Sequence, residues 1–83
     1  MYYAYVLKSI KFDWYYKGLT DNVNRRFDEH NNGLVKKTKH YAPFNLVHVE
    51  ILETQKLARM MEKYLKSGFG REIIKEIEKS VNI

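Results

Sequence analysis

The pattern of apolar and polar positions predicts three β-strands. Residues 2–9 are dense in tyrosine, valine and leucine, and residues 14–20 resume the aromatic alternation after a short mixed segment. Two such segments with a loop of a few residues between them predict a hairpin. Residues 44–52 predict a third strand with Val47, Val49 and Ile51 on one face, and this apolar strand suits a central position in the sheet. We therefore expect a three-stranded sheet.

A first helix is expected between the hairpin and the third strand, over residues 22–32. Thr20 or Asp21 can serve as its N-cap, and Gly33 is a typical residue for its C-terminal stop. Within this helix Arg26 and His30, four residues apart, lie on one face. We expect both at the boundary between core and solvent, where they are held but exposed.

Two more helices follow the third strand. Thr54 can cap a helix over residues 55–66, whose apolar positions cover a broad face, and a break at Ser67-Gly68 precedes a third helix over residues 70–80. The element order is then ββαβαα. This order predicts an α+β fold with a three-stranded mixed or antiparallel sheet and flanking helices, forming one domain over residues 1–83.

Composition narrows the class of protein. The 83 residues contain no cysteine, so disulfides and thiolate metal sites are excluded, and a metal would be bound by oxygen or histidine nitrogen. No apolar run approaches the roughly 20 residues that span a bilayer, and no signal peptide is evident, so we expect a cytoplasmic protein without a membrane partner.

The positive charge is unevenly distributed. Residues 1–49 carry eight Lys and Arg against four Asp and Glu, whereas residues 50–83 carry seven against six, within a net charge of +5. The loop before the third strand holds Lys36, Lys37, Lys39 and His40. A cationic half rich in tyrosine suits nucleic acid, because lysine and arginine displace counterions from phosphates and aromatic rings stack on bases.

Several fragments, in this order and on these elements, resemble the GIY-YIG endonucleases, in particular the small single-domain members. The resemblance covers nearly the whole chain. It rests on Tyr3-Ala4-Tyr5, on Tyr16-Lys17-Gly18 followed by Thr20, on Arg26-Phe27 with Glu29-His30, on Lys39-His40-Tyr41, and on Glu62-Lys63-Tyr64-Leu65-Lys66-Ser67.

The resemblance implies a metal-dependent endonuclease that hydrolyses DNA phosphodiester bonds, in DNA repair or processing. Its two motif tyrosines fall on Tyr5 and Tyr16, its helix arginine on Arg26, the position four residues later on His30, and its metal-binding glutamate on Glu62. The implied ion is Mg²⁺ or Mn²⁺, held by that carboxylate and by waters. Lys17 and the basic loop, with Lys36, Lys37, Lys39 and His40, are expected to contact the nucleic acid.

The chain also departs from the family pattern. Tyr3-Ala4 stands where the family has Gly-Ile, Lys17 replaces an apolar residue, and no late asparagine is evident after Glu62. These differences keep an alternative open, in which the chain is a catalytically weak or inactive nucleic-acid-binding module of the same fold. A third possibility is an interaction domain whose aromatic hairpin binds a protein.

The residues leave the general base and the specificity open. Tyr16 is the first candidate for the base, with Tyr5 orienting the water and His30 serving as base or shuttle in its place. Taken alone, Glu62 also fits an ordinary helix-surface pair with Lys66, four residues later. So short a chain is expected to have low sequence specificity or to obtain it from a protein partner, and its oligomeric state is not predicted.

Overall fold

The computed structural model describes residues 1–81 and contains one antiparallel sheet of three strands. The strands are β1 (Tyr2–Ser9), β2 (Tyr15–Thr20) and β3 (Phe44–Leu52), in the spatial order β2-β1-β3. The expectation that the third strand is central is therefore wrong. The central strand is β1, whose residues from Ala4 to Leu7 are all buried, so that it carries apolar side chains into both faces.

A β-bulge in β3 also changes which residues share a face. Val6 of β1 pairs with His48 but Leu7 pairs with Leu46, so Val47 has no partner in the ladder. The extra residue shifts the alternation. Val47 packs on one face of the sheet and Val49 on the other, which corrects the prediction that they lie together.

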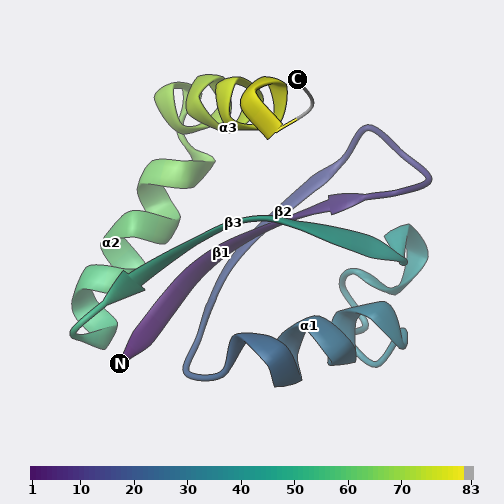
Figure 1. Cartoon of the computed structure of the whole chain (residues 1–83). Helices are drawn as coiled ribbons and strands as arrows, with labels where there is room; N and C mark the ends of the chain where they lie inside the picture. Colours follow the sequence, from purple (N-terminus) through teal and green to yellow (C-terminus); the bar gives the residue numbers. More distant parts are fainter. Residues whose placement is uncertain (82–83) are drawn as a thin grey trace.

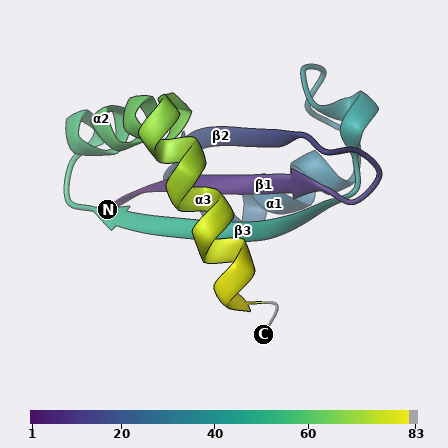
Figure 2. The same cartoon turned by 90° about the horizontal axis from the view of Figure 1, so that it is seen from above.

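Helices cover both faces of the sheet (Figure 1). The helix α1 (Val23–Asn31) lies on one face, while α2 (Gln55–Lys66) and α3 (Gly68–Val81) lie on the other. Seen from above, α3 crosses the strands (Figure 2). The α+β fold and the order ββαβαα are thus as predicted. Among residues 1–81, none of the helices has the length and apolar character needed to cross a membrane.

Each face of the sheet has its own hydrophobic core. On the α2 and α3 face, Ala4 and Val6 pack with Leu65 and Ile74. The α1 face is aromatic, with Tyr5, Leu7 and Phe44 at its centre; Trp14, Tyr16, Phe27, Tyr41, Ala42 and Val49 surround them. The aromatic core is the one that holds the candidate site.

The helix ends follow capping rules, with one change from the prediction. Asn22, rather than Thr20 or Asp21, is the N-cap of α1: its side-chain oxygen accepts the backbone N–H of Arg25 at 3.0 Å. Thr20 instead accepts the backbone N–H of Asn22 at 3.1 Å, which fixes the turn before the helix. Thr54 caps α2 as predicted, accepting from the backbone N–H of Leu57 at 3.1 Å.

Two other boundaries differ slightly from the sequence pattern. The helix α3 begins at Gly68, two residues early, because Ser67 accepts the backbone N–H of Gly70 at 3.2 Å and starts the helix directly after α2. The loop before β3 contains a short 3₁₀ helix, η1 (Lys39–Tyr41).

Candidate active site

The side chain of Tyr5 crosses the neighbouring strand at a glycine. Tyr5 pairs with Gly18 in the sheet, and a Cβ atom on Gly18 would lie 2.7 Å from the Tyr5 hydroxyl oxygen and 2.9 Å from Tyr16. The absence of a side chain at Gly18 thus opens the space that the ring occupies. Tyr5 and Tyr16 are diagonal neighbours with ring centroids 6.2 Å apart, so the register does bring them together.

A buried chain of hydrogen bonds continues from Tyr5 into the protein. The Tyr5 hydroxyl oxygen lies 3.0 Å from Nε2 of His30, and Nδ1 of His30 lies 2.7 Å from Oγ1 of Thr38. Thr38 donates to the carbonyl oxygen of Val35 at 3.5 Å. Since the threonine hydroxyl has one proton, it accepts from Nδ1–H, and Nε2 then accepts the proton of Tyr5.

Burial sets the protonation of this chain. His30 and Thr38 are completely buried, and Tyr5 is only 2% exposed. Burial, with a smaller contribution from the charge of Arg26, lowers the pKa of His30 to about 4. Burial, followed by the neighbouring phenol of Tyr16, raises the pKa of Tyr5 to about 12. At neutral pH both groups are therefore uncharged. We expected His30 at the boundary between core and solvent, and this prediction is wrong. The imidazole lies inside the aromatic core.

Arg26 lies at the open side of the tyrosine pair. It is partly exposed and donates to Glu29 at 3.0 Å. Burial alone would lower the pKa of Arg26, but its hydrogen bonds to Glu29 and Tyr5 outweigh burial and raise it. Arg26 is therefore a permanent cation beside the Tyr5 hydroxyl, with guanidinium nitrogens left over for a ligand.

Glu62 approaches the same tyrosine from the opposite face of the sheet. It belongs to α2, its side chain is 19% exposed, and its negative charge raises the pKa of Tyr5. It also forms the i,i+4 ion pair with Lys66, at 3.6 Å. Tyr16, Arg26 and Glu62 thus all act electrostatically on the Tyr5 hydroxyl, and His30 is hydrogen-bonded to it.

The predicted nucleic-acid contacts separate into two groups. Thr38 points inward to His30, whereas its neighbours Lys36, Lys37, Lys39 and His40 are exposed. Lys17 lies on the other face of the sheet, where its ammonium group is 5.4 Å from the centre of the Tyr15 ring. Burial, then the charges of Arg71 and Lys66, lower the pKa of Lys17.

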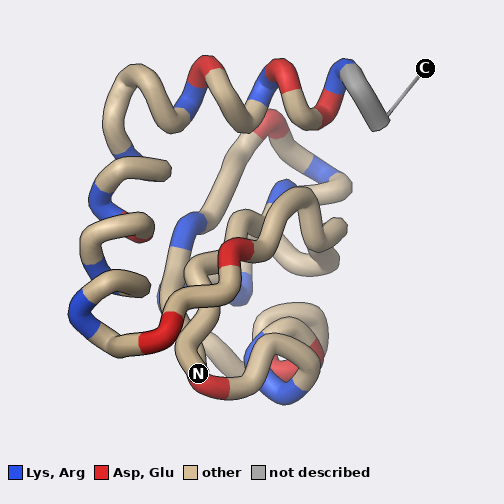
Figure 3. The backbone as a smooth tube through the Cα atoms, turned by 60° about the vertical axis from the view of Figure 1, so that its left-hand side comes forward, with Lys and Arg blue, Asp and Glu red and all other residues tan. Residues whose placement is uncertain are grey.

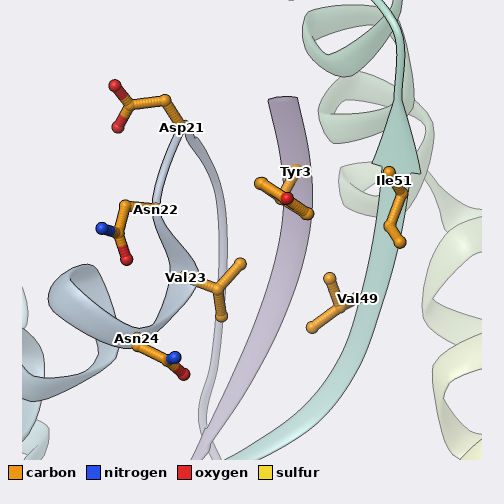
Figure 4. Close-up of a pocket in the computed structure, with 7 residues that line it drawn as sticks. All are labelled: Tyr3, Asp21, Asn22, Val23, Asn24, Val49 and Ile51. Carbon is orange, nitrogen blue, oxygen red and sulfur yellow. The ribbon is translucent and has the colours of Figure 1, made fainter. Parts of the chain in front are cut away.

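A hollow at the start of α1 is lined by none of the predicted site residues. Figure 4 shows Val23, Val49 and Ile51 around its apolar part, with Tyr3 on β1. Its polar rim contains Asp21 and two asparagines and no lysine or arginine. The one carboxylate, that of Asp21, is paired with Arg25 at 3.0 Å.

The carboxylate of Glu62 fits a hard divalent ion. Within residues 1–81 there is no group of three or more His, Asp or Glu residues that could form a metal cage. Mg²⁺ does not need one, because it keeps several waters and is often held by one or two carboxylates together with substrate phosphate. A single carboxylate whose side chain is 19% exposed is compatible with that mode of binding.

Sequence reasoning missed Thr38. It stands between two exposed lysines in a segment without apolar periodicity, and only the fold shows that it is completely buried against His30. Its position one residue before η1 could not indicate its burial, since η1 itself was not predicted.

Comparisons with known proteins find similar sequences and a similar structure. The model of the GIY-YIG catalytic domain matches residues 1–76. UPF0213 proteins of Clostridium perfringens and Natronomonas pharaonis are each 39% identical over 67 residues, which is 80% of this chain and 71% and 78% of theirs. The solution NMR structure of a UPF0213 protein of Bacillus halodurans is 28% identical, has a TM-score of 0.54, and covers 93% of this chain and 85% of its own.

Proposed function

The chain belongs to the GIY-YIG family, and from that premise we propose that it is a divalent-metal-dependent endonuclease that hydrolyses DNA phosphodiester bonds, in DNA repair or processing. Family membership indicates nuclease activity. The observation that carries the proposal for this chain is the convergence on Tyr5 of a forked cation from α1 and a carboxylate from α2.

Arg26 binds the phosphate in this proposal. Its guanidinium can donate two parallel hydrogen bonds to phosphate oxygens, and it remains charged throughout the reaction. The hydrogen bond to Glu29 holds the side chain in place before substrate arrives. Arg26 therefore stabilises the negative charge that grows on the phosphate as water attacks.

Tyr5 orients the attacking water, and His30 orients Tyr5. The buried imidazole accepts the phenol proton, which directs the lone pairs of the Tyr5 oxygen toward Arg26 and the open edge of β2. Because His30 is completely buried and both of its nitrogens are occupied, it acts through Tyr5. Tyr16, half-buried with its ring 4.9 Å from that of His30, is the candidate for the general base.

Glu62 holds the metal ion together with waters. Mg²⁺ or Mn²⁺ bound there would supply Lewis-acid charge neutralisation for phosphodiester hydrolysis. The same carboxylate also pairs with Lys66 at 3.6 Å. Lys17 and the loop residues Lys36, Lys37, Lys39 and His40 contact the DNA backbone, and sequence specificity is low or is supplied by a protein partner.

The proposal is tested by cleavage of supercoiled plasmid and of single-stranded DNA, with Mg²⁺ and with EDTA. We expect Mg²⁺-dependent cleavage by the wild type and a loss of about 100-fold or more in Arg26→Ala. The matched control is Arg25→Ala, since Arg25 is the preceding residue of the same helix but pairs with Asp21 at 3.0 Å, exposed to solvent. DNA binding without cleavage would instead assign the non-catalytic nucleic-acid-binding module.

A further inference from the structure

One side of α2 is covered by basic residues. Lys56, Arg59, Lys63 and Lys66 are all exposed, and their spacing of three, four and three residues puts them on one side of the helix. We call these four residues the α2 basic stripe. In Figure 3, Lys and Arg positions recur along α2, whereas along α3 they alternate with Asp and Glu.

The charges of the stripe are not compensated within the protein. The only acidic residue of α2 is Glu62, which pairs with Lys66. In the part of the chain that the structure describes, Lys56, Arg59 and Lys63 form no ion pair within 4 Å. A solvated helix face ordinarily mixes both signs, because like charges three or four residues apart repel.

The helix α3 provides the internal comparison. It carries three basic residues, Arg71, Lys75 and Lys79, and three acidic residues, Glu72, Glu76 and Glu78. Both helices are amphipathic and both pack on the same face of the sheet, so burial does not explain the difference in charge. Of these two helices, only α2 therefore carries an excess of positive charge.

The stripe borders Glu62 and continues toward Lys17. Glu62 lies on α2 between the buried side of the helix and the stripe, and its carboxylate is 3.6 Å from the ammonium group of Lys66. Lys66 also lies close to Lys17, because after burial the charges of Arg71 and Lys66 lower the pKa of Lys17. Lys17 and Arg71 line a cleft between β2 and α3, together with Asp13, Trp14, Tyr15, Ile74 and Lys75.

We propose that the α2 basic stripe binds the sugar-phosphate backbone of the DNA strand whose phosphodiester is cleaved beside Glu62. This inference rests on the proposed function. The ten residue steps from Lys56 to Lys66 span about 15 Å at 1.5 Å per residue, which matches roughly four phosphates at 3.4 Å per nucleotide of one strand. The strand then continues from Lys66 toward Lys17 and Arg71.

The test is the salt dependence of DNA binding, measured by fluorescence anisotropy of a labelled oligonucleotide in EDTA, where no cleavage interferes. Each phosphate contact contributes roughly 0.7 to 0.9 to the slope of log K against log salt. The triple variant Lys56→Ala/Arg59→Ala/Lys63→Ala should lose about 2 to 3 of that slope. Its affinity at about 0.1 M salt should fall by 100-fold or more.

Lys79→Ala on α3 is the matched control for the single variant Lys56→Ala. Both remove one exposed lysine and the same net charge, but only Lys56→Ala should lower the slope, by about 0.7 to 0.9. An unchanged slope in the triple variant, or an equal loss in Lys79→Ala, would overturn the proposal, as would a wild type that does not bind DNA.

Cleavage separates this inference from the proposed function. If the wild type cleaves DNA and the triple variant binds DNA normally, the proposal for the α2 basic stripe is refuted and the proposed nuclease activity stands. If the triple variant loses DNA binding and the wild type never cleaves in Mg²⁺, DNA binding by the α2 basic stripe is supported and the proposed nuclease activity is refuted.

Discussion

Acid should destabilise this protein through His30. The imidazole is completely buried, and its pKa is lowered from its ordinary value of 6.5 to about 4 because the charged form is not solvated. The unfolded chain therefore binds more protons than the folded protein between these two values. The stability that comes from keeping His30 neutral is fully present above pH 6.5 and is lost as the pH falls toward 4.

The size of this loss follows from the two pKa values. The whole difference corresponds to about 3 kcal/mol, and the part between pH 7 and pH 5 is about 2 kcal/mol. Small domains have unfolding free energies of about 5 to 15 kcal/mol, so the loss is large enough to measure. It also precedes most carboxylate titration, which lies near pH 4.

Urea denaturation followed by circular dichroism at pH 7 and pH 5 measures the loss. The variant His30→Gln, which keeps a side chain capable of hydrogen bonding but cannot titrate, should lose much less stability over the same interval. An NMR titration of His30 provides a second measurement that does not depend on a variant. A pKa near 6.5 for His30, or equal stability of the wild type at the two pH values, would refute the reasoning.

Three further predictions concern the residues that hold Tyr5 and α1. Gly18→Ala should push the Tyr5 ring aside, because the new Cβ would lie 2.7 Å from the Tyr5 hydroxyl oxygen, and should lower the free energy of unfolding by about 1 to 3 kcal/mol and the cleavage rate at least tenfold. An unchanged position of Tyr5 in a crystal structure of the variant would contradict this. Thr38→Val should cost about 1 to 3 kcal/mol in urea denaturation and shift the ¹⁵N resonances of His30, while Thr38→Ser should restore both; a silent Thr38→Val would show that the hydroxyl does not set the tautomer. Asn22→Ala should lower the free energy of unfolding by about 1 kcal/mol and leave cleavage intact, and a change below 0.3 kcal/mol, measured by thermal denaturation, would show that the cap is replaceable.

Local patterns were sufficient to predict the elements of this fold. The apolar strand-forming residues of 2–9 and 44–52 predict the two strands that are observed, and Thr54 caps its helix as predicted, because strand propensity and helix capping depend on a few neighbouring residues. The strand order and the bulge at Val47 were not predictable in this way. They depend on which strand is buried on both faces, and this is decided by partners far along the chain.

The candidate site shows the same division. The motif residues Tyr5, Tyr16, Arg26 and Glu62 could be named from spacing and resemblance, and their roles remain proposals. The environment of His30 could not be read from spacing, because its position on α1 fits either a half-exposed or a buried face. Its burial depends on residues far apart in the sequence, including Tyr5 of β1 and Thr38 from a loop eight residues later, which are both hydrogen-bonded to it.

The central claim is that Glu62 serves a metal ion at a phosphodiester rather than only an ion pair with Lys66. Single-turnover cleavage of DNA measured against Mg²⁺ concentration tests it most directly, with Glu72→Gln, an exposed glutamate of α3, as the matched control. The wild type and Glu72→Gln should show cleavage that rises with Mg²⁺ and saturates, while folded Glu62→Gln should be at least about 100-fold slower at every Mg²⁺ concentration. A Glu62→Gln protein that cleaves at the wild-type rate with the same Mg²⁺ dependence would contradict the account.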